Sequence, residues 1–492
     1  MLTEEGKKWR QDRLDKIESY LNKETRQDFI DDNYIEKLIS QPSKIDKNYI
    51  QTLIQKTKEL KGLTPEETAY LLNIEDENIW EELFQTARFV KNEVYGNRIV
   101  LFAPLYLSNY CVNNCLYCGF RESNKDMTYK RLNDKEIELE IQTLTKMGHK
   151  RLIVVYGEDP SSDIHYMEHS IKKIYDTKNG HDFIRRVNVN AAPLFVDEYK
   201  VLKDIGIGTY QVFQETYHKE TYKKLHPQNT IKGNYLWRLF SLHRAQDAGI
   251  DDVAIGALFG LYKWKFEVLA LLYHAMDLEK EFGVGSHTIS FPRLEPALGT
   301  PYIQKTQHKV SDADFKKIVA ILRLAVPYTG LILTAREQPE LRREVIKLGV
   351  SQTDAGTRVA IGGYHLSEQE HIPEKEQFQI GDTRSVDEYI YELISDGFIP
   401  SFCTAGYRCG RTGCEFMSFA RNGQVKKFCV PNAILTFKEY LLDYASQKTI
   451  TKGEEIIQDY ITFVRQNYSE KTADIIQKYL KRMENGERDI YF

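Results

Sequence analysis

The sequence is poor in cysteine, and none of its cysteines stands alone. Seven of the 492 residues are cysteine, and they form two groups: Cys111, Cys115 and Cys118, then Cys403, Cys409, Cys414 and Cys429. An odd number of thiols without a secretion signal argues against a disulfide framework, because cytosolic thiols are kept reduced. Grouped reduced thiols usually bind metal, so both groups are candidate metal sites.

The sequence also lacks a strong net charge and a long apolar run. Its formal net charge of −4 gives no reason to expect nucleic acid or an anionic membrane as a partner. No apolar run approaches the roughly 18 residues of a membrane span, and the N-terminus MLTEEGKKWRQDRLDKIE is too charged for a signal peptide. The composition is that of a soluble globular protein, which we expect to be cytoplasmic.

Short β-branched runs alternate with segments of helical length from residue 96 onward. The strand candidates are 98–107, 151–157, 185–191, 208–214, 251–257, 287–292, 330–335 and 350–356. Their number and spacing predict a (β/α)8 TIM barrel, an α/β fold, with a doubly wound sheet as the alternative that periodicity leaves open. We expect a helical extension over 1–95, the barrel over 96–356, and a mostly helical domain with an auxiliary metal site over 357–492.

The first cysteine group lies just past the first strand, at the end of a barrel where enzymes place their chemistry. Its spacing, Cys-x3-Cys-x2-Cys, wraps three thiolates around a small centre. A 4Fe-4S cluster has four irons, so one iron would lack a protein ligand and could bind a substrate. Structural zinc usually takes four protein ligands, and no histidine or fourth cysteine follows at a customary spacing. Buried, inert cysteines are the other alternative.

The cysteine spacing, with Tyr117 before the last cysteine, resembles the signature of the radical S-adenosylmethionine (SAM) superfamily. The resemblance becomes closer over LFAPLYLSNYCVNNCLYCGFR, GEDP, RRVNVN, GIGTYQVFQETYH, GIDDVAIGALFGLY, HTISFPRLEPALGT and PNAILTFKEYLLDYA. These segments resemble the tyrosine lyases of the superfamily, a group that includes the FeFe-hydrogenase maturase HydG and the related thiamine enzyme ThiH. The similarity runs from about residue 60 to 446.

This resemblance implies a reaction and its cofactors. A 4Fe-4S cluster on Cys111, Cys115 and Cys118 would hold SAM, whose cleavage yields a 5′-deoxyadenosyl radical. The radical would take a hydrogen from the amino group of L-tyrosine, or a related amino acid, and cause Cα–Cβ scission to p-cresol and dehydroglycine. In HydG the latter becomes CO and cyanide for the hydrogenase cluster. The implied partners are a reductant such as ferredoxin or flavodoxin, and other hydrogenase maturation proteins.

Strand ends provide further candidate residues. Gly157 and Glu158 match the superfamily's Gly-Glu element beside the cofactor's ammonium, and Asn188 and Asn190 share one face of the third strand. Each has a plainer structural alternative. Gly157 and Glu158 could form an ordinary turn, and the two asparagines could belong to a polar barrel core. Gln211 and Glu215 could be a solvated pair at a loop, and Gly256 and Tyr117 could serve apolar packing. The full set of cofactor-binding candidates is Tyr117, Gly157, Glu158, Asn188, Asn190, Gln211, Glu215 and Gly256.

Two catalytic candidates come from the sixth strand. A tyrosine α-carboxylate in a closed barrel needs a counter-charge, and Arg293 at the strand end can supply a bidentate fork. A structural ion pair with Glu295 is its alternative. His287 aligns with a histidine that the family uses on a labile iron, and a hydrogen-bonded core histidine is its alternative.

The second cysteine group departs from the resemblance. The HydG pattern there is Cys-x2-Cys-x22-Cys, and Cys403 and Cys429 match its ends, but Gly406 stands at the middle position. Cys409 or Cys414 could supply the third thiolate. Alternatively all four could close a cluster, or hold zinc; or the thiols could be reduced and buried. A cluster closed by four cysteines has no vacant iron.

Three functions therefore stay open. The first is a HydG-like tyrosine lyase that makes CO and cyanide. The second is a paralogue that cleaves tyrosine or a similar amino acid without making them. The third is a non-catalytic cluster scaffold, which the intact barrel motifs count against, because a scaffold has no use for a cofactor site.

Overall fold

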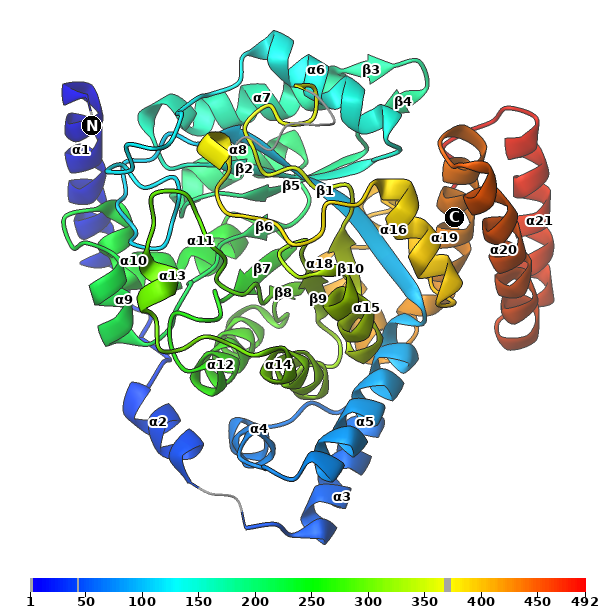
Figure 1. Cartoon of the computed structure of the whole chain (residues 1–492), viewed down its shortest axis with the longest axis horizontal. Helices are drawn as coiled ribbons and strands as arrows, with labels where there is room; N and C mark the ends of the chain where they lie inside the picture. The colour runs from blue at the N-terminus through cyan, green and yellow to red at the C-terminus, as the bar shows by residue number, and fades with distance from the viewer. Residues whose placement is uncertain (1–2, 42–43, 367–372) are drawn as a thin grey trace.

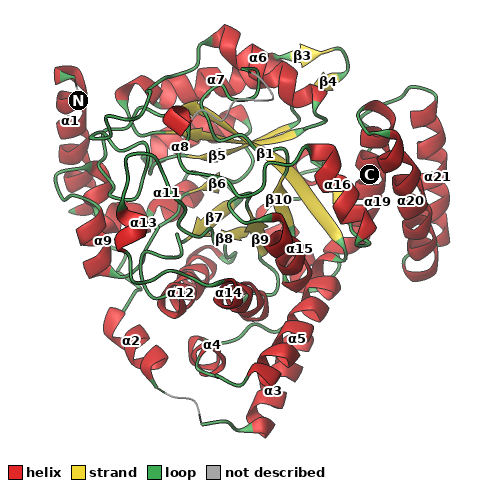
Figure 2. Cartoon of the chain, in the orientation of Figure 1, coloured by secondary structure: helices red, strands yellow, loops and turns green. Residues whose placement is uncertain are grey.

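Eight parallel strands close into a barrel at the centre of the chain, as the computed structural model shows (Figures 1 and 2). Each strand pairs with the next, and the last pairs back with the first through Val100 and Gln352. The (β/α)8 barrel predicted from strand spacing is confirmed. Its strands are β1 (Arg98–Ser108), β2 (Arg151–Tyr156), β5 (Arg186–Asn190), β6 (Tyr210–Gln211), β7 (Val253–Gly256), β8 (Thr288–Ser290), β9 (Gly330–Leu333) and β10 (Gln352–Asp354).

Helices cover the outside of the barrel. In α6, for example, Ile137, Ile141 and Leu144 form a buried stripe, and Asn133 and Glu136 form a capping box at its start. The outer helices are α6 (Asp134–Lys146), α7 (Ile164–Asp176), α8 (Val196–Ile205), α9 (Lys219–Leu225), α10 (Tyr235–Leu239), α11 (Ser241–Asp247), α12 (Trp264–Phe282), α13 (Tyr302–Lys305), α14 (Asp312–Ala325), α15 (Pro339–Leu348) and α16 (Val386–Ser395). A small hairpin, β3 (Lys178–Asn179) and β4 (Asp182–Phe183), lies outside.

The structure describes residues 3–41, 44–366 and 373–492. Its region before the barrel is helical. Thr64 and Glu67 form a capping box, with Pro65 at the first helical position, as the helix-start signals of the sequence indicate. The helices are α1 (Glu4–Leu21), α2 (Asp32–Ser40), α3 (Lys47–Lys58), α4 (Pro65–Leu72) and α5 (Glu77–Tyr95). No helix within the described ranges has the length and apolarity that crossing a membrane would require.

A ninth strand, β11 (Ile399–Ser401), extends the sheet outside the closed barrel by pairing with the start of β1 at Arg98. Strand spacing did not indicate it. The second cysteine group begins just after β11, so it lies at the amino ends of the barrel strands, opposite the first group. The helices that follow are α17 (Ala405–Arg408), α18 (Gly413–Arg421), α19 (Val425–Asp443), α20 (Gln447–Asn467) and α21 (Glu470–Glu484). The last two pack beside α19 at one side of the molecule (Figure 1). The expected domain boundaries stay a prediction.

Candidate active site

A cavity of about 220 Å³ opens at the carboxyl ends of the barrel strands. Inward-pointing residues form its walls, and on β1 these are Phe102, Pro104 and Tyr106, which alternate along the strand. The loop after β1 forms one rim and carries the first cysteine group into the cavity. Barrel enzymes place their chemistry at this end.

Cys111, Cys115 and Cys118 all line this cavity. Burial raises the pKa of the Cys111 and Cys115 thiols to about 12, so these thiols become thiolates only when a metal cation is bound. Asn113 Nδ2 lies 3.7 Å from Cys111 Sγ, and Gln377 Nε2 lies 3.8 Å from Cys118 Sγ. Amide donors aimed at sulfur are typical partners of thiolate ligands in iron–sulfur sites.

The spacing of the sulfurs disfavours a single ion. No three cysteine sulfurs in the described chain lie within 4.8 Å of one another. Zinc bound at about 2.3 Å to each sulfur would hold its thiolates within roughly 4.6 Å of one another. The cavity lining, within the described ranges, also contains no histidine and no fourth cysteine. The donor set therefore fits a larger centre with three protein ligands.

Gly157 holds the cysteine loop against the end of β2. Its N–H donates to the Ser108 carbonyl at 2.8 Å, and Val112 N–H donates to the Glu158 carbonyl at 2.7 Å. A Cβ at position 157 would lie 2.1 Å from the carbonyl oxygen of Tyr110. Only glycine lets the two backbones approach this closely.

Polar atoms without partners point to a ligand in the cavity. Glu158 accepts from Asn113 Nδ2 at 2.6 Å through Oε2, while its Oε1 is buried with no hydrogen-bond partner. Gln211 Nε2 is buried and unpartnered in the same way, and Asn190 lines the same wall. Buried polar atoms normally have partners, so these groups are suited to receive a polar ligand.

Glu215 lies across the cavity in a strained conformation, with φ at 71°. Its carboxylate is 2.8 Å from Lys232 Nζ and 3.6 Å from Arg238. Although burial opposes ionisation, these two cations hold the pKa of Glu215 below its usual value. The side chain is therefore a fixed carboxylate acceptor.

Tyr117 also lines the cavity, beside Cys115. Its hydroxyl lies 2.7 Å from His226 Nε2, and its ring packs with Leu225 and Leu258. Burial, then the nearby cations, keeps the pKa of His226 well below its usual value, so this ring is neutral. The ring position of Tyr117 is thus fixed by a hydrogen bond and by apolar contacts.

Asn188 and Gly256 are not among the residues that line the cavity. Asn188 Oδ1 accepts from the Thr209 N–H at 3.0 Å, which satisfies its side chain within the barrel core. A Cβ at Gly256 would lie 2.5 Å from the Phe213 ring, so this glycine serves close packing. Asn188 therefore matches the alternative of a polar barrel core, and Gly256 matches the alternative of apolar packing.

Arg293 also lies outside the cavity lining. Its guanidinium forms ion pairs with Glu337 and with Asp312, the latter at 2.8 Å, and donates to the Val310 carbonyl. It stacks on Phe315 as well. All its donors point to protein groups, so the structure gives Arg293 an ion-pair role, with Glu337 in place of the expected Glu295.

Arg336 is the arginine that lines the cavity. It stacks on Phe378 at 3.3 Å, and no carboxylate of the described chain forms an ion pair with it. Sequence reasoning missed it, although LILTAREQ places it just past a predicted strand, the same signal that pointed to Arg293. Glu295 lines the cavity too, and burial, reinforced by Glu337, raises its pKa to about 7.

His287 lies at the amino end of β8, on the far side of the barrel from this cavity. Its Nδ1 is 3.2 Å from Asp252 Oδ1, and its ring is 4.9 Å from the Phe416 ring on α18. This position is on the side of the second cysteine group. The expected link between His287 and that group stays a prediction.

The four thiols of the second cysteine group differ in burial. Cys403 and Cys429 are half-buried, and burial, with a contribution from Cys429, raises the pKa of the Cys403 thiol to about 11. Cys409 and Cys414 are exposed, and Cys409 Sγ faces the Phe492 carbonyl at 3.8 Å. With glycine at position 406, the three-thiol set of the HydG pattern is incomplete. The described residues do not fit that cluster as they stand.

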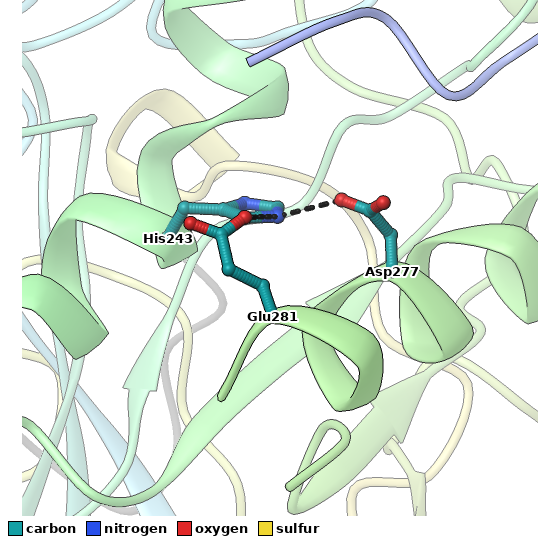
Figure 3. A group of neighbouring side chains, drawn as sticks. All are labelled: His243, Asp277 and Glu281. Atoms are coloured by element: carbon teal, nitrogen blue, oxygen red, sulfur yellow. Dashed lines mark hydrogen bonds and ion pairs between the residues drawn. The ribbon is translucent and has the colours of Figure 1, made fainter. Parts of the chain in front are cut away.

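One other group of potential metal ligands lies in the helical layer (Figure 3). His243 Nε2 is 2.9 Å from Asp277 and 3.8 Å from Glu281. Arg26 already neutralises Glu281 at 2.6 Å, and His243 Nδ1 is buried without a partner, whereas metal-bound histidines normally donate through their second nitrogen. This group is therefore an ion-pair network.

Comparisons with known proteins show the family of the chain. Residues 105–271 match the model of the Radical SAM superfamily, and residues 290–399 match the Biotin and Thiamin Synthesis associated domain. The chain is 30% identical to 2-iminoacetate synthase of Escherichia coli (strain K12) over 359 residues, which is 70% of this chain and 89% of that protein.

Two solved structures are similar over most of the chain. A crystal structure of HydG, a maturase of the [FeFe]-hydrogenase, is 52% identical, with a TM-score of 0.90, and the match covers 95% of this chain and all of that one. HydG from Carboxydothermus hydrogenoformans is 41% identical, with a TM-score of 0.78 and coverage of 91% and 97%.

Replacing Gly157 with alanine should displace the cysteine loop. We expect Gly157→Ala to lower the free energy of unfolding by about 1–3 kcal/mol, because the added methyl group meets a backbone oxygen. Iron bound after anaerobic reconstitution should fall with it. Gly285→Ala is the control, because its backbone does not have a positive φ and a Cβ there would approach no atom closer than 3.2 Å. Urea unfolding and iron analysis measure both effects, and full iron loading of Gly157→Ala would contradict the role of this contact.

Proposed function

Because the chain belongs to the radical SAM enzymes of the HydG and ThiH group, we propose that it cleaves the Cα–Cβ bond of L-tyrosine to p-cresol and dehydroglycine. The observation that carries the proposal is the shared cavity. Three cysteines, an arginine without a carboxylate partner in the described chain, and buried polar atoms without hydrogen-bond partners all face one space at the mouth of the barrel.

Cys111, Cys115 and Cys118 would hold the 4Fe-4S cluster, and Glu158, Asn190, Gln211 and Glu215 would bind SAM on it. When they are bound, the cluster and SAM together supply a 5′-deoxyadenosyl radical. The free Oε1 of Glu158 is suited to accept from the cofactor's ammonium. The ionised Glu215 is suited to accept from ribose hydroxyls. Tyr117 would fix the cofactor's position by packing beside Cys115.

Arg336 would bind the α-carboxylate of the substrate. A guanidinium matches a carboxylate with two parallel hydrogen bonds, and Phe378 holds its plane from one face. Glu215 and Glu295 act on it only at longer range, so its charge is available to a ligand. Walls formed by Tyr106, Phe120 and Leu258 would exclude water from the reacting atoms.

A HydG-like lyase would also make CO and cyanide for a hydrogenase. One observation favours the alternative, a paralogue that cleaves tyrosine without making them. Cys409 and Cys414 are exposed, Cys429 lies close enough to Cys403 to act on its thiol, and Gly406 has no side chain to bind metal. A chain without the third thiol would cleave tyrosine but release its product unconverted. A cytoplasmic location, an electron donor such as ferredoxin or flavodoxin, and contact with other maturation proteins stay predictions.

The first test is product analysis. Anaerobically reconstituted protein, given tyrosine, SAM and a reductant, should release p-cresol and 5′-deoxyadenosine, as measured by chromatography. Cys115→Ala should abolish both, because it removes one of the three cavity thiols. Deoxyadenosine without p-cresol would point to another substrate. Cleavage of SAM retained in Cys115→Ala would remove the first cysteine group from the reaction.

The substrate-binding role of Arg336 can be separated from that of Arg293. Arg336→Lys keeps the charge but loses the fork, so the KM for tyrosine should rise about tenfold or more. Arg293→Lys should leave this KM nearly unchanged and lower the Tm instead, because its partners Glu337 and Asp312 are structural. Steady-state p-cresol kinetics and thermal unfolding distinguish the two, and the reverse pattern would return the carboxylate to Arg293.

Position 406 tests the second cysteine group. A Cβ there meets only the Arg411 carbonyl, at 3.2 Å, so a cysteine can be accommodated. Gly406→Cys should raise the iron content per chain after reconstitution by restoring the third thiol. Cys409→Ser and Cys414→Ser serve as controls and should leave the iron content unchanged, because both thiols are exposed. Iron lost in either serine variant, with no gain in Gly406→Cys, would mean that these cysteines complete the site.

A further inference from the structure

We propose that Glu295 is a catalytic residue of the cavity at the barrel mouth, which binds the α-ammonium group of the amino-acid substrate and takes a proton from it. This role rests on the proposed function, because it concerns the same cavity and the same substrate. Arg336 would bind the α-carboxylate, and Glu295 would bind the other charged end. Both charges of an amino acid are joined to one carbon, so the two groups that bind them must be neighbours.

Glu295 and Arg336 lie on neighbouring parts of the cavity wall. Arg336 Nη1 donates to the Arg293 carbonyl at 3.4 Å, two residues before Glu295 in the chain. The charges of Glu295 and Arg336 also act on each other. A carboxylate bound to Arg336 would therefore bring the ammonium group of the same substrate toward Glu295.

Backbone hydrogen bonds hold the segment that carries Glu295 on both of its sides. The Leu294 N–H donates to the Phe259 carbonyl at 2.8 Å. The Gln379 N–H donates to the Pro296 carbonyl, also at 2.8 Å. Glu295 stands between these two bonds, so its side chain projects from a fixed stretch of backbone, as a catalytic group requires.

Glu295 is free of partners, unlike the other acids of the cavity. Among the described residues, the carboxylates that line the cavity are Glu158, Glu215, Glu295 and Asp354. Glu215 pairs with Lys232 at 2.8 Å, and Asp354 pairs with Arg342 at 3.1 Å. Glu158 accepts from Asn113 at the cysteine loop, where its proposed role is with the cofactor. In the described chain no hydrogen bond or ion pair engages the Glu295 carboxylate.

The surroundings of Glu295 suit a group that accepts a proton near neutral pH. Burial, then repulsion by Glu337, raises the pKa of Glu295 to about 7, and the charges of Arg336 and Arg293 oppose only part of this rise. An ordinary glutamate, with a pKa of about 4.3, is a weak acceptor for an α-amino group, whose pKa is about 7.7–8.0. Proton transfer is most efficient when the pKa of the acceptor lies near the working pH.

The step is a proton transfer that needs no oxidant or reductant. Tyrosine enters with its amino group as an ammonium. One N–H bond breaks, its electron pair stays on nitrogen, and the proton forms an O–H bond on the Glu295 carboxylate. The neutral amine that results can lose a hydrogen atom without leaving a cationic nitrogen radical. Because Glu295 is half-buried, it can release the proton to solvent once the products have left.

Ligand binding tests the ammonium contact without turnover. The reconstituted full chain with SAM, but without reductant, would be titrated by calorimetry at about pH 8, where Glu295 is ionised. The two ligands are L-tyrosine and 3-(4-hydroxyphenyl)propanoate, which lacks the amino group. Glu295→Gln should weaken tyrosine binding about tenfold or more and change propanoate binding less than about twofold. Glu340→Gln, which removes an exposed charge on α15, is the control and should change neither. Equal losses for both ligands in Glu295→Gln, or no loss for either, would overturn the proposal.

Kinetics test the proton transfer itself. Glu295 must be ionised to accept a proton, so the wild-type kcat/KM for tyrosine should rise with pH, with half of the rise near pH 7. In Glu295→Gln the kcat for p-cresol should fall about a hundredfold or more, and this pH dependence should disappear. Glu295→Asp should recover part of the rate. The wild-type profile does not depend on how any variant folds. An unchanged rate, or the wild-type pH profile, in Glu295→Gln would rule out the catalytic role.

The outcomes separate this role from tyrosine cleavage as such. Wild-type protein that makes p-cresol, with no effect of Glu295→Gln on binding or rate, would sink the role of Glu295 alone. Wild-type protein that makes no p-cresol would sink the lyase proposal. A selective loss of tyrosine affinity in Glu295→Gln would then still show that this carboxylate binds an ammonium group.

Discussion

The arrangement of the cavity depends on one backbone contact, between Gly157 at the end of β2 and Tyr110 in the cysteine loop. Because a Cβ at position 157 would lie 2.1 Å from the Tyr110 oxygen, the two segments come this close only with glycine. The contact sets Glu158 against Asn113 and turns the three thiols toward the barrel axis. The three thiols and the Glu158 carboxylate are thus positioned by the same turn.

Buried cations of the chain differ in their partners. Arg342 pairs with Asp354 and Asp382, and Lys150 pairs with Asp182. Arg336 at the mouth of the barrel has no carboxylate partner in the described chain. Its charge is therefore available to an anion that enters the cavity. The apolar residues Phe102, Ile153 and Ile332 pack together in the barrel interior.

Much of the fold could be predicted from the sequence, because most barrel strands lie in β-branched runs and several helices, such as α4 and α6, have a local start signal. All eight barrel strands lie where the pattern indicated. The ninth, β11, was missed because its three residues carry no periodicity, and its pairing with β1 is set by the helices that follow. The cysteine loop was found because ligand spacing is local in sequence.

The arginine that we propose as the substrate-binding residue could not be chosen from the sequence, because its environment is not local. Arg293 and Arg336 both follow a strand. Arg293, however, forms an ion pair with Glu337, which is 1% exposed and follows another strand, β9. Asn188 likewise alternates correctly with Asn190, yet the Thr209 N–H of the neighbouring strand already occupies its oxygen. The exposure of Cys409 and Cys414 depends on how α17 and α18 pack at the amino end of the barrel. Such contacts follow from tertiary packing, which strand and ligand spacing do not encode.

Electron–nuclear double resonance tests directly whether the three cavity thiols hold a cluster with one iron open to SAM. Reduced, reconstituted protein would be mixed with SAM labelled with 15N in its amino group and 13C in its carboxylate. We expect hyperfine coupling from both labels to the cluster, and the loss of both couplings in Cys118→Ala. A reduced cluster signal without coupling to either label would contradict SAM binding at an open iron.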